Sequence, residues 1–186
     1  MRRGTARAAG PLTLLVVLGT AGCVGPSTDP VPTTAEAPFL CDGVPREGVE
    51  LMTGLAEPEV EQAGDRSDPE ARRGCAVRDD DGETVLNVSW RTIDGLGVGS
   101  PEEYLETLAG DENATPIEAD ASGGGYVIGP RDQPAGYWVC DDSRWLLVEL
   151  FDGADGRDGF DDVARFVESV LPWTCGGEDF PEAEES

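Results

Sequence analysis

The chain has 186 residues, which is enough for one ordinary domain with flanking segments. Its 13 basic residues are all arginine and stand against 38 acidic residues, so the formal net charge is −25. This charge repels nucleic acid and anionic lipid headgroups, and we expect no nucleic-acid partner. The chain has no histidine, which removes the commonest general base and a frequent metal ligand.

Residues 1–22 have the three parts of a secretory signal peptide. Three arginines near the start are followed by an apolar run from Leu12 to Leu18, and small residues from Gly19 to Gly22 precede Cys23. The apolar run is much shorter than the roughly 20 residues that cross a bilayer. The sequence therefore predicts a cleaved leader rather than a transmembrane helix.

The small residues before Cys23 resemble the lipobox of bacterial lipoproteins. In that family a diacylglycerol is attached to the cysteine thiol and the leader is removed in front of it. The resemblance implies lipidation at Cys23 and anchoring on the extracytoplasmic face of the cytoplasmic membrane; ordinary secretion or an uncleaved anchor are the alternatives. Residues 23–38, rich in Pro and Thr after the cysteine, are expected to form a tether of up to about 45 Å.

The five cysteines are an odd number, which needs an explanation in a secreted protein. If Cys23 carries lipid, an even set of four remains in a compartment where disulfides persist. Four cysteines allow three pairings, and the sequence does not choose among them. We favour the pairing in which each bond brackets a helical segment and a strand in one half of the chain, Cys41–Cys75 and Cys140–Cys175.

The first half of the chain carries signals for a helix and a β-hairpin. Pro45 suits the first position of a helix, and Gly54 suits its end. The Asp-Gly pair at 81–82 accepts the positive φ of a tight hairpin turn. The expected elements are a helix over 45–53, a further short helical turn over 57–63, and strands over 75–78 and 84–92.

The second half begins with a strong helix start at Ser100, with Pro101 next and Glu103 completing a capping box. The run from Trp145 to Phe151 is apolar at nearly every position, which indicates a central strand covered on both faces. The expected elements are a helix ending near 110, strands over 126–128, 137–141 and 144–151, and a helix from its cap at Asp158 to Leu171.

This order predicts an α+β domain over residues 39–175, with an antiparallel sheet of about five strands, helices packed on it and two disulfides. The acidic segment over 176–186 is expected to be a disordered tail. On the final helix, apolar residues form one stripe, and Asp162, Arg165 and Ser169 are expected to face solvent. The tryptophans occur about one per element and are expected in the core.

Two segments carry a further resemblance. Cys41-Asp-Gly-Val-Pro45 opens a helix, and Gly74-Cys75-Ala-Val77 begins a strand. Together with the lipobox and the tether they resemble uncharacterised lipoproteins of the actinobacterial envelope. Some related envelope lipoproteins have an α/β sandwich similar to the PsbP fold, which the resemblance makes a possible fold here. It implies no catalytic residues.

Asp152, Asp155 and Asp158 recur at every third position of a Gly-rich loop, and oxygen ligands of this kind suit calcium. The spacing does not match an EF-hand, because Ala154 and Gly156 occupy two ligand positions. A solvated turn with Asp158 capping the next helix is the simpler interpretation. We therefore expect no metal or other cofactor, and these three aspartates are only weak candidates.

No nucleophile with a nearby base and no phosphate-binding loop occurs in the sequence. We therefore expect a protein that is not an enzyme, namely a membrane-anchored extracytoplasmic lipoprotein whose acidic domain binds an envelope protein or a small ligand. One alternative is a calcium-binding or other cation-binding envelope protein that uses the loop from Asp152 to Asp162. Another is a hydrolase that depends on carboxylates alone.

Overall fold

The computed structural model describes residues 27–64, 72–92 and 99–183. The leader and Cys23 lie outside these residues, so lipidation stays a prediction. Within the described segments, no helix has both the length and the apolar character needed to span a bilayer.

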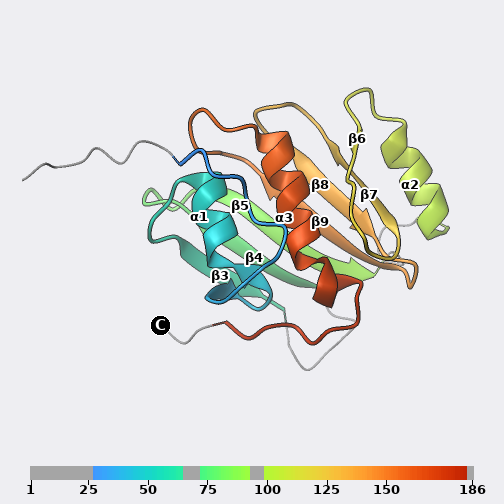
Figure 1. Ribbon diagram of the computed structural model, residues 1–186, viewed down its shortest axis with the longest axis horizontal. Helices are drawn as coiled ribbons and strands as arrows, with labels where there is room; N and C mark the ends of the chain where they lie inside the picture. Colours follow the sequence, from blue (N-terminus) through green and yellow to red (C-terminus); the bar gives the residue numbers. More distant parts are fainter. Residues whose placement is uncertain (1–26, 65–71, 93–98, 184–186) are drawn as a thin grey trace, which may run out of the picture.

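The domain is α+β, as expected, with one large antiparallel sheet, a small two-stranded sheet and three helices (Figure 1). The large sheet has seven strands in the order β3-β4-β5-β9-β8-β7-β6. Its strands are β3 (Glu59–Ala63), β4 (Arg73–Arg78), β5 (Thr84–Thr92), β6 (Thr115–Pro116), β7 (Gly124–Ile128), β8 (Ala135–Val139) and β9 (Arg144–Leu150). The remaining elements are β1 (Phe39–Cys41), β2 (Val44–Pro45), α1 (Arg46–Thr53), α2 (Pro101–Ala109) and α3 (Gly159–Thr174).

The expected count of about five strands was wrong, chiefly because β3 and β6 carry weak sequence signals. The segment at 57–63 was expected to be helical, but Glu59–Ala63 pairs along its length with β4. All five residues of β3 are exposed, so no apolar alternation marks the strand in the sequence. Pairing with β4 outweighs the helical preference of its glutamates and alanine.

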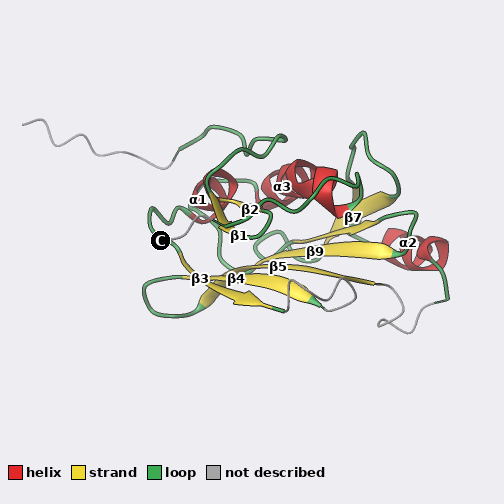
Figure 2. Ribbon diagram, turned by 90° about the horizontal axis from the view of Figure 1, so that it is seen from below, coloured by secondary structure: helices red, strands yellow, loops and turns green. Residues whose placement is uncertain are grey.

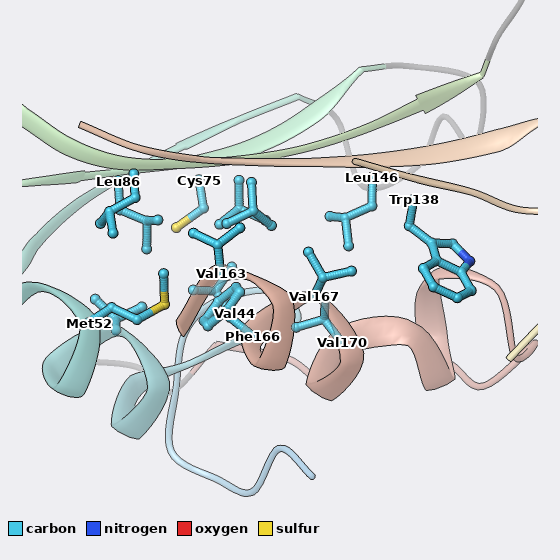
Figure 3. Packing of buried hydrophobic residues seen from close by; sticks show 14 of the residues in the cluster. Val44, Met52, Cys75, Leu86, Trp138, Leu146, Val163, Phe166, Val167 and Val170 are labelled. Atoms are coloured by element: carbon cyan, nitrogen blue, oxygen red, sulfur yellow. The ribbon is translucent and has the colours of Figure 1, made fainter. Parts of the chain in front are cut away.

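Helices α1 and α3 cover one face of the large sheet, and the main core lies between these layers (Figure 2). Figure 3 shows Val167 of α3 directed toward Leu146 on the sheet, while Phe166 lies beside Val44. Gly136 of β8 permits this close approach, because a Cβ at this position would lie 2.6 Å from Val163 Cγ1.

Strand β9 is central in the sheet, as its apolar run predicted, with β5 and β8 on its two sides. Leu146, Val148 and Leu150 belong to the main core, whereas Trp145 and Leu147 are buried on the opposite face. On that opposite face, residues of α2 pack against the second cluster. Both faces of β9 are therefore covered.

From Ser27 onward, the segment that was expected to be a free tether packs on the domain. Val31 is completely buried, and its carbonyl oxygen accepts a hydrogen bond from Arg165 Nε at 2.6 Å. Arg157 Nη1 donates to the carbonyl oxygens of Ser27 and Asp29 at 2.8 and 2.9 Å. The segment over 27–38 is thus part of the domain, because two arginines bind its backbone and one valine fills the core.

The expected disordered tail is likewise packed through Ala183. Phe180 makes an edge-to-face contact with Trp90, with ring centroids 5.5 Å apart. The Gly43 N–H donates to the Pro181 carbonyl oxygen at 2.9 Å, and the Ala183 N–H donates to Asp42 Oδ1 at 3.2 Å. One aromatic side chain and these backbone hydrogen bonds order an otherwise acidic segment.

Both favoured disulfides are confirmed. Cys41 and Cys75 have Cα atoms 6.0 Å apart, and Cys140 and Cys175 have Cα atoms 5.4 Å apart. The first bond joins β1 to β4. The second joins the turn after β8 to the end of α3.

Helix α3 begins after its predicted cap but continues past Leu171 to Thr174. Asp162 and Ser169, expected to face solvent, are buried at 3% and 2% exposure. Asp162 forms an ion pair with Arg157, and Ser169 Oγ donates to the Phe166 carbonyl oxygen at 2.7 Å. Arg165 is half-buried because it binds the N-terminal segment. Internal partners therefore allow polar residues on the packed side of the helix.

Candidate functional site: an arginine and tryptophan cleft

A cleft of about 350 Å³ opens at the end of the large sheet where β5 ends and where β4 and β9 begin. It is lined on one side by the C-terminal tail from Gly177 to Phe180 and by the end of α3. We call it the Arg/Trp cleft, because its lining includes Arg73, Arg91, Arg144, Trp90, Trp145 and Trp173.

Strand register brings these residues together from three strands. Trp90 lies opposite Arg73 of β4, and Arg91 lies opposite Trp145 of β9. Successive side chains of a strand point to opposite faces. Trp90 therefore lies on the face covered by α3, whereas Arg91 and Trp145 share the other face. The Arg/Trp cleft thus wraps around the end of the sheet.

Trp145 lies between a cation and a second aromatic ring. The guanidinium carbon of Arg91 is 4.5 Å from the Trp145 ring centroid. On the other flanking strand, Tyr137 stacks on Trp145 with centroids 6.1 Å apart and an angle of 12° between the rings. Tyr104 of α2 meets both rings edge-on. These contacts hold the indole in one orientation and keep Arg91 flat against it.

The two tyrosines lie in a partly dry environment. Burial, together with a smaller effect of the neighbouring Tyr137, raises the pKa of Tyr104 to about 12. Burial is also the main reason that the pKa of Tyr137 is raised. Removal of water disfavours the charged phenolate in both cases. The same dry surroundings strengthen any charged contact that Arg91 makes at this position.

The other side of the Arg/Trp cleft is fixed by α3 and by the tail. Trp90 Nε1 donates to Thr174 Oγ1 at 3.0 Å, and this hydroxyl donates to the Val170 carbonyl oxygen. The guanidinium of Arg73 lies over the Phe180 ring at 5.3 Å. These contacts place one aromatic surface of the cleft on the α3 side.

Several buried hydrogen-bond donors at the Arg/Trp cleft have no partner. They are Arg91 Nε, Trp145 Nε1 and Trp173 Nε1, and Ser89 Oγ on the same strand as Arg91 is also unpaired. Buried donors in proteins are nearly always paired, so a group of them at one site requires an explanation. A ligand that supplies acceptor oxygens would provide a partner for Arg91, whose side chain is half-buried, whereas Trp173 Nε1 lies beside Gly43, which does not line the cleft.

The arginines of the cleft differ in how they are paired. Arg144 forms an ion pair with Asp142 at 2.8 Å, and hydrogen bonds from Arg144 lower the pKa of that carboxyl group. Within the described segments, no carboxylate forms an ion pair with Arg91. Arg91 is therefore the cation of the cleft that is available to a ligand.

The weak calcium candidates are not brought together as a site. Asp158 caps α3, as expected, by accepting the N–H of Phe160 at 3.0 Å. Asp152 and Asp155 lie exposed in the loop before that cap. Within the described residues, no group of three or more His, Cys, Asp or Glu side chains is placed to hold a metal ion.

The four tryptophans are all buried, as expected for core residues. Three of them also line the Arg/Trp cleft, and this role was missed, as was the role of the arginines. The available signal was the pair of dipeptides Trp90-Arg91 and Arg144-Trp145, in which a cation adjoins an indole at a strand end.

No family model, curated protein or solved structure matches the chain.

Proposed function

We propose that the protein is a non-catalytic lipoprotein, anchored through Cys23 on the outer face of the cytoplasmic membrane, whose domain binds a small ligand in the Arg/Trp cleft. The leader and the lipobox-like residues before Cys23 support the anchor. The two disulfides suit an oxidising compartment. The likeness to actinobacterial envelope lipoproteins, and to their PsbP-like sandwich, belongs to this same proposal.

The observation that carries the binding proposal is the composition of the Arg/Trp cleft. Small-molecule sites are concave, mostly apolar, and contain a few polar groups that orient the ligand. A volume of about 350 Å³ with three tryptophans and Phe180 provides the apolar part, and Arg91 provides a polar group. A concave site of this size favours a small ligand over an envelope protein. The cation-binding alternative gains no support within the described residues, because no group of three or more His, Cys, Asp or Glu side chains there is placed to hold a metal ion.

The anchor is tested by growing cells on a clickable palmitate analogue. We expect the label on the wild-type chain and none on the Cys23→Ser variant. Unlabelled wild-type protein, or protein recovered from the cytosol with reduced thiols, would contradict the anchor.

Ligand binding is tested on the purified Cys23→Ser chain. The chain is equilibrated with the small-molecule fraction of the cells that produce it and desalted, and the retained compounds are identified by mass spectrometry. Thr92 lines the cleft, so Thr92→Trp should fill it and abolish retention, whereas Thr92→Ser should preserve it. Retention of no compound, or equal retention by the Thr92→Trp variant, would contradict the proposal.

A further inference from the structure

We infer that the ligand of the Arg/Trp cleft is a small anion that carries a flat apolar group, with its carboxylate, sulfonate or phosphate oxygens bound by Arg91. This inference rests on the proposed binding function and specifies the chemistry of that site. It depends on two features of the cleft: Arg91 forms no ion pair within the described residues, and aromatic side chains line the cleft beside α3.

The unpaired hydrogen-bond donors of Arg91 indicate that the ligand is an anion. The guanidinium carbon of Arg91 lies 4.5 Å from the Trp145 ring centroid, its Nε is buried without a partner, and no carboxylate of the described chain forms an ion pair with it. A guanidinium presents its donors as a fork that matches two oxygens of one anionic group. It has donors and no acceptor, and it therefore selects acceptor oxygens.

The aromatic side chains that line the cleft indicate that the ligand carries a flat apolar group. Trp90, Trp173 and Phe180 line the cleft on the side of α3, whereas the Trp145 ring on the other side is covered by Arg91 and Tyr137. Aromatic surfaces bind planar groups by stacking and by edge-to-face contact. A cleft of about 350 Å³ lies near the lower end of the range for ligand sites, so the ligand is small.

The charge of the surrounding chain limits how the anion is bound. Glu178 and Asp179 are exposed at the margin of the cleft and repel an anion. Affinity must therefore come from the close contact with Arg91, which is half-buried, and not from the field of the whole domain. Removing the charges of these two carboxylates should therefore strengthen the binding of an anion, whereas removing the charge of Arg91 should weaken it.

The experiment is calorimetric titration of the Cys23→Ser chain with four probes: naphthoate, naphthamide, naphthylmethylammonium and inorganic phosphate. Naphthoate should bind about tenfold more tightly than naphthamide, because it alone offers a charged partner to Arg91. The ammonium probe and phosphate should each bind more weakly than naphthoate, since the first lacks the anion and the second lacks the flat group.

Arg91→Gln should remove the preference for naphthoate over naphthamide. Arg131→Gln is the matched control, because Arg131 is 83% exposed and pairs with Asp158, away from the cleft. Glu178→Gln combined with Asp179→Asn should tighten naphthoate binding by about twofold or more. Both substitutions in this second variant are on the exposed tail, so the variant tests the effect of the negative charge near the cleft without changing the packing of the core.

Equal binding of naphthoate and naphthamide, tighter binding of the ammonium probe, an unchanged preference in Arg91→Gln, or no binding of any probe would each overturn the inference. The proposed function fails separately, if no cellular compound is retained or if Thr92→Trp retains the same compounds. A retained compound that is neutral or cationic would leave the binding function standing and would disprove the anionic ligand.

Discussion

Arg157 and Asp162 form a nearly fully buried ion pair, with side chains exposed by 8% and 4%. Two hydrogen bonds, of 2.6 and 2.7 Å, join the guanidinium to the carboxylate, and they are the main reason that the pKa of Arg157 is raised. The same guanidinium also binds the carbonyl oxygens of Ser27 and Asp29. One ion pair therefore connects the start of α3 to the N-terminal segment.

Asp162→Asn should lower the free energy of unfolding by about 3 kcal/mol, because it leaves a buried guanidinium without its counter-charge. Urea unfolding measures the loss. Glu61→Gln is the control, since Glu61 pairs with Arg78 on the surface and its side chain is 67% exposed. That change should cost less than about 1 kcal/mol. Equal losses in the two variants would show that the buried pair contributes no more than a surface pair.

Stability should fall at alkaline pH because the pKa of Tyr104 is raised to about 12, above its ordinary value of 10.0. The folded chain holds this phenolic proton more tightly than the unfolded chain does. The contribution is therefore complete below pH 10 and is lost as the pH rises toward 12. Urea unfolding at a series of pH values measures the loss, and Tyr104→Phe should reduce its slope. An identical slope in Tyr104→Phe would contradict this assignment.

Gly136→Ala should destabilise the fold by about 1–3 kcal/mol through overpacking of α3 against β8. The added Cβ would lie 2.6 Å from Val163 Cγ1 and 2.9 Å from Val167 Cγ2. Thermal unfolding measures the loss. Combining Gly136→Ala with Val163→Ala should cost less than the sum of the two single changes, because the second removes the closest clashing group. Additive losses would place the cause elsewhere.

Replacing Cys140 and Cys175 together by serine should cost about 3–4 kcal/mol, as expected for a bond that closes a loop with a sequence separation of 35. The bond holds the end of α3 beside the turn after β8. Chemical unfolding of the double variant and of the oxidised parent chain measures the difference. A loss below about 1 kcal/mol would mean that packing alone fixes this end of α3.

Local signals were sufficient for much of the fold. The cap at Ser100 accepts the Glu103 N–H, the cap at Asp158 begins α3, and the Asp-Gly turn joins β4 to β5. Each signal acts within a few residues, so a single sequence reveals it. The central position of β9 was equally predictable, because its apolar run is covered on both faces.

Elements that depend on distant partners could not be predicted in this way. Strand β3 exists because β4 lies beside it, and Val31 is ordered because Arg165 binds its backbone. In the sequence Phe180 is a single aromatic residue in an acidic segment, and only the fold reveals its contact with Trp90. The Arg/Trp cleft has the same origin, since only the register of β5 against β9 sets Arg91 on Trp145. Such contacts are properties of the assembled sheet.

Docking of the segment that starts at Ser27 has a geometric consequence for the proposed anchor. Only three residues separate Cys23 from Ser27, so a lipid on Cys23 would keep Ser27 within about 14 Å of the headgroups. The 16 residues of α3 span about 24 Å, and the Arg/Trp cleft lies at the far end of this helix. The lipid would then hold the domain close to the membrane through Ser27, and the length of α3 would separate the binding site from Arg157, which binds Ser27.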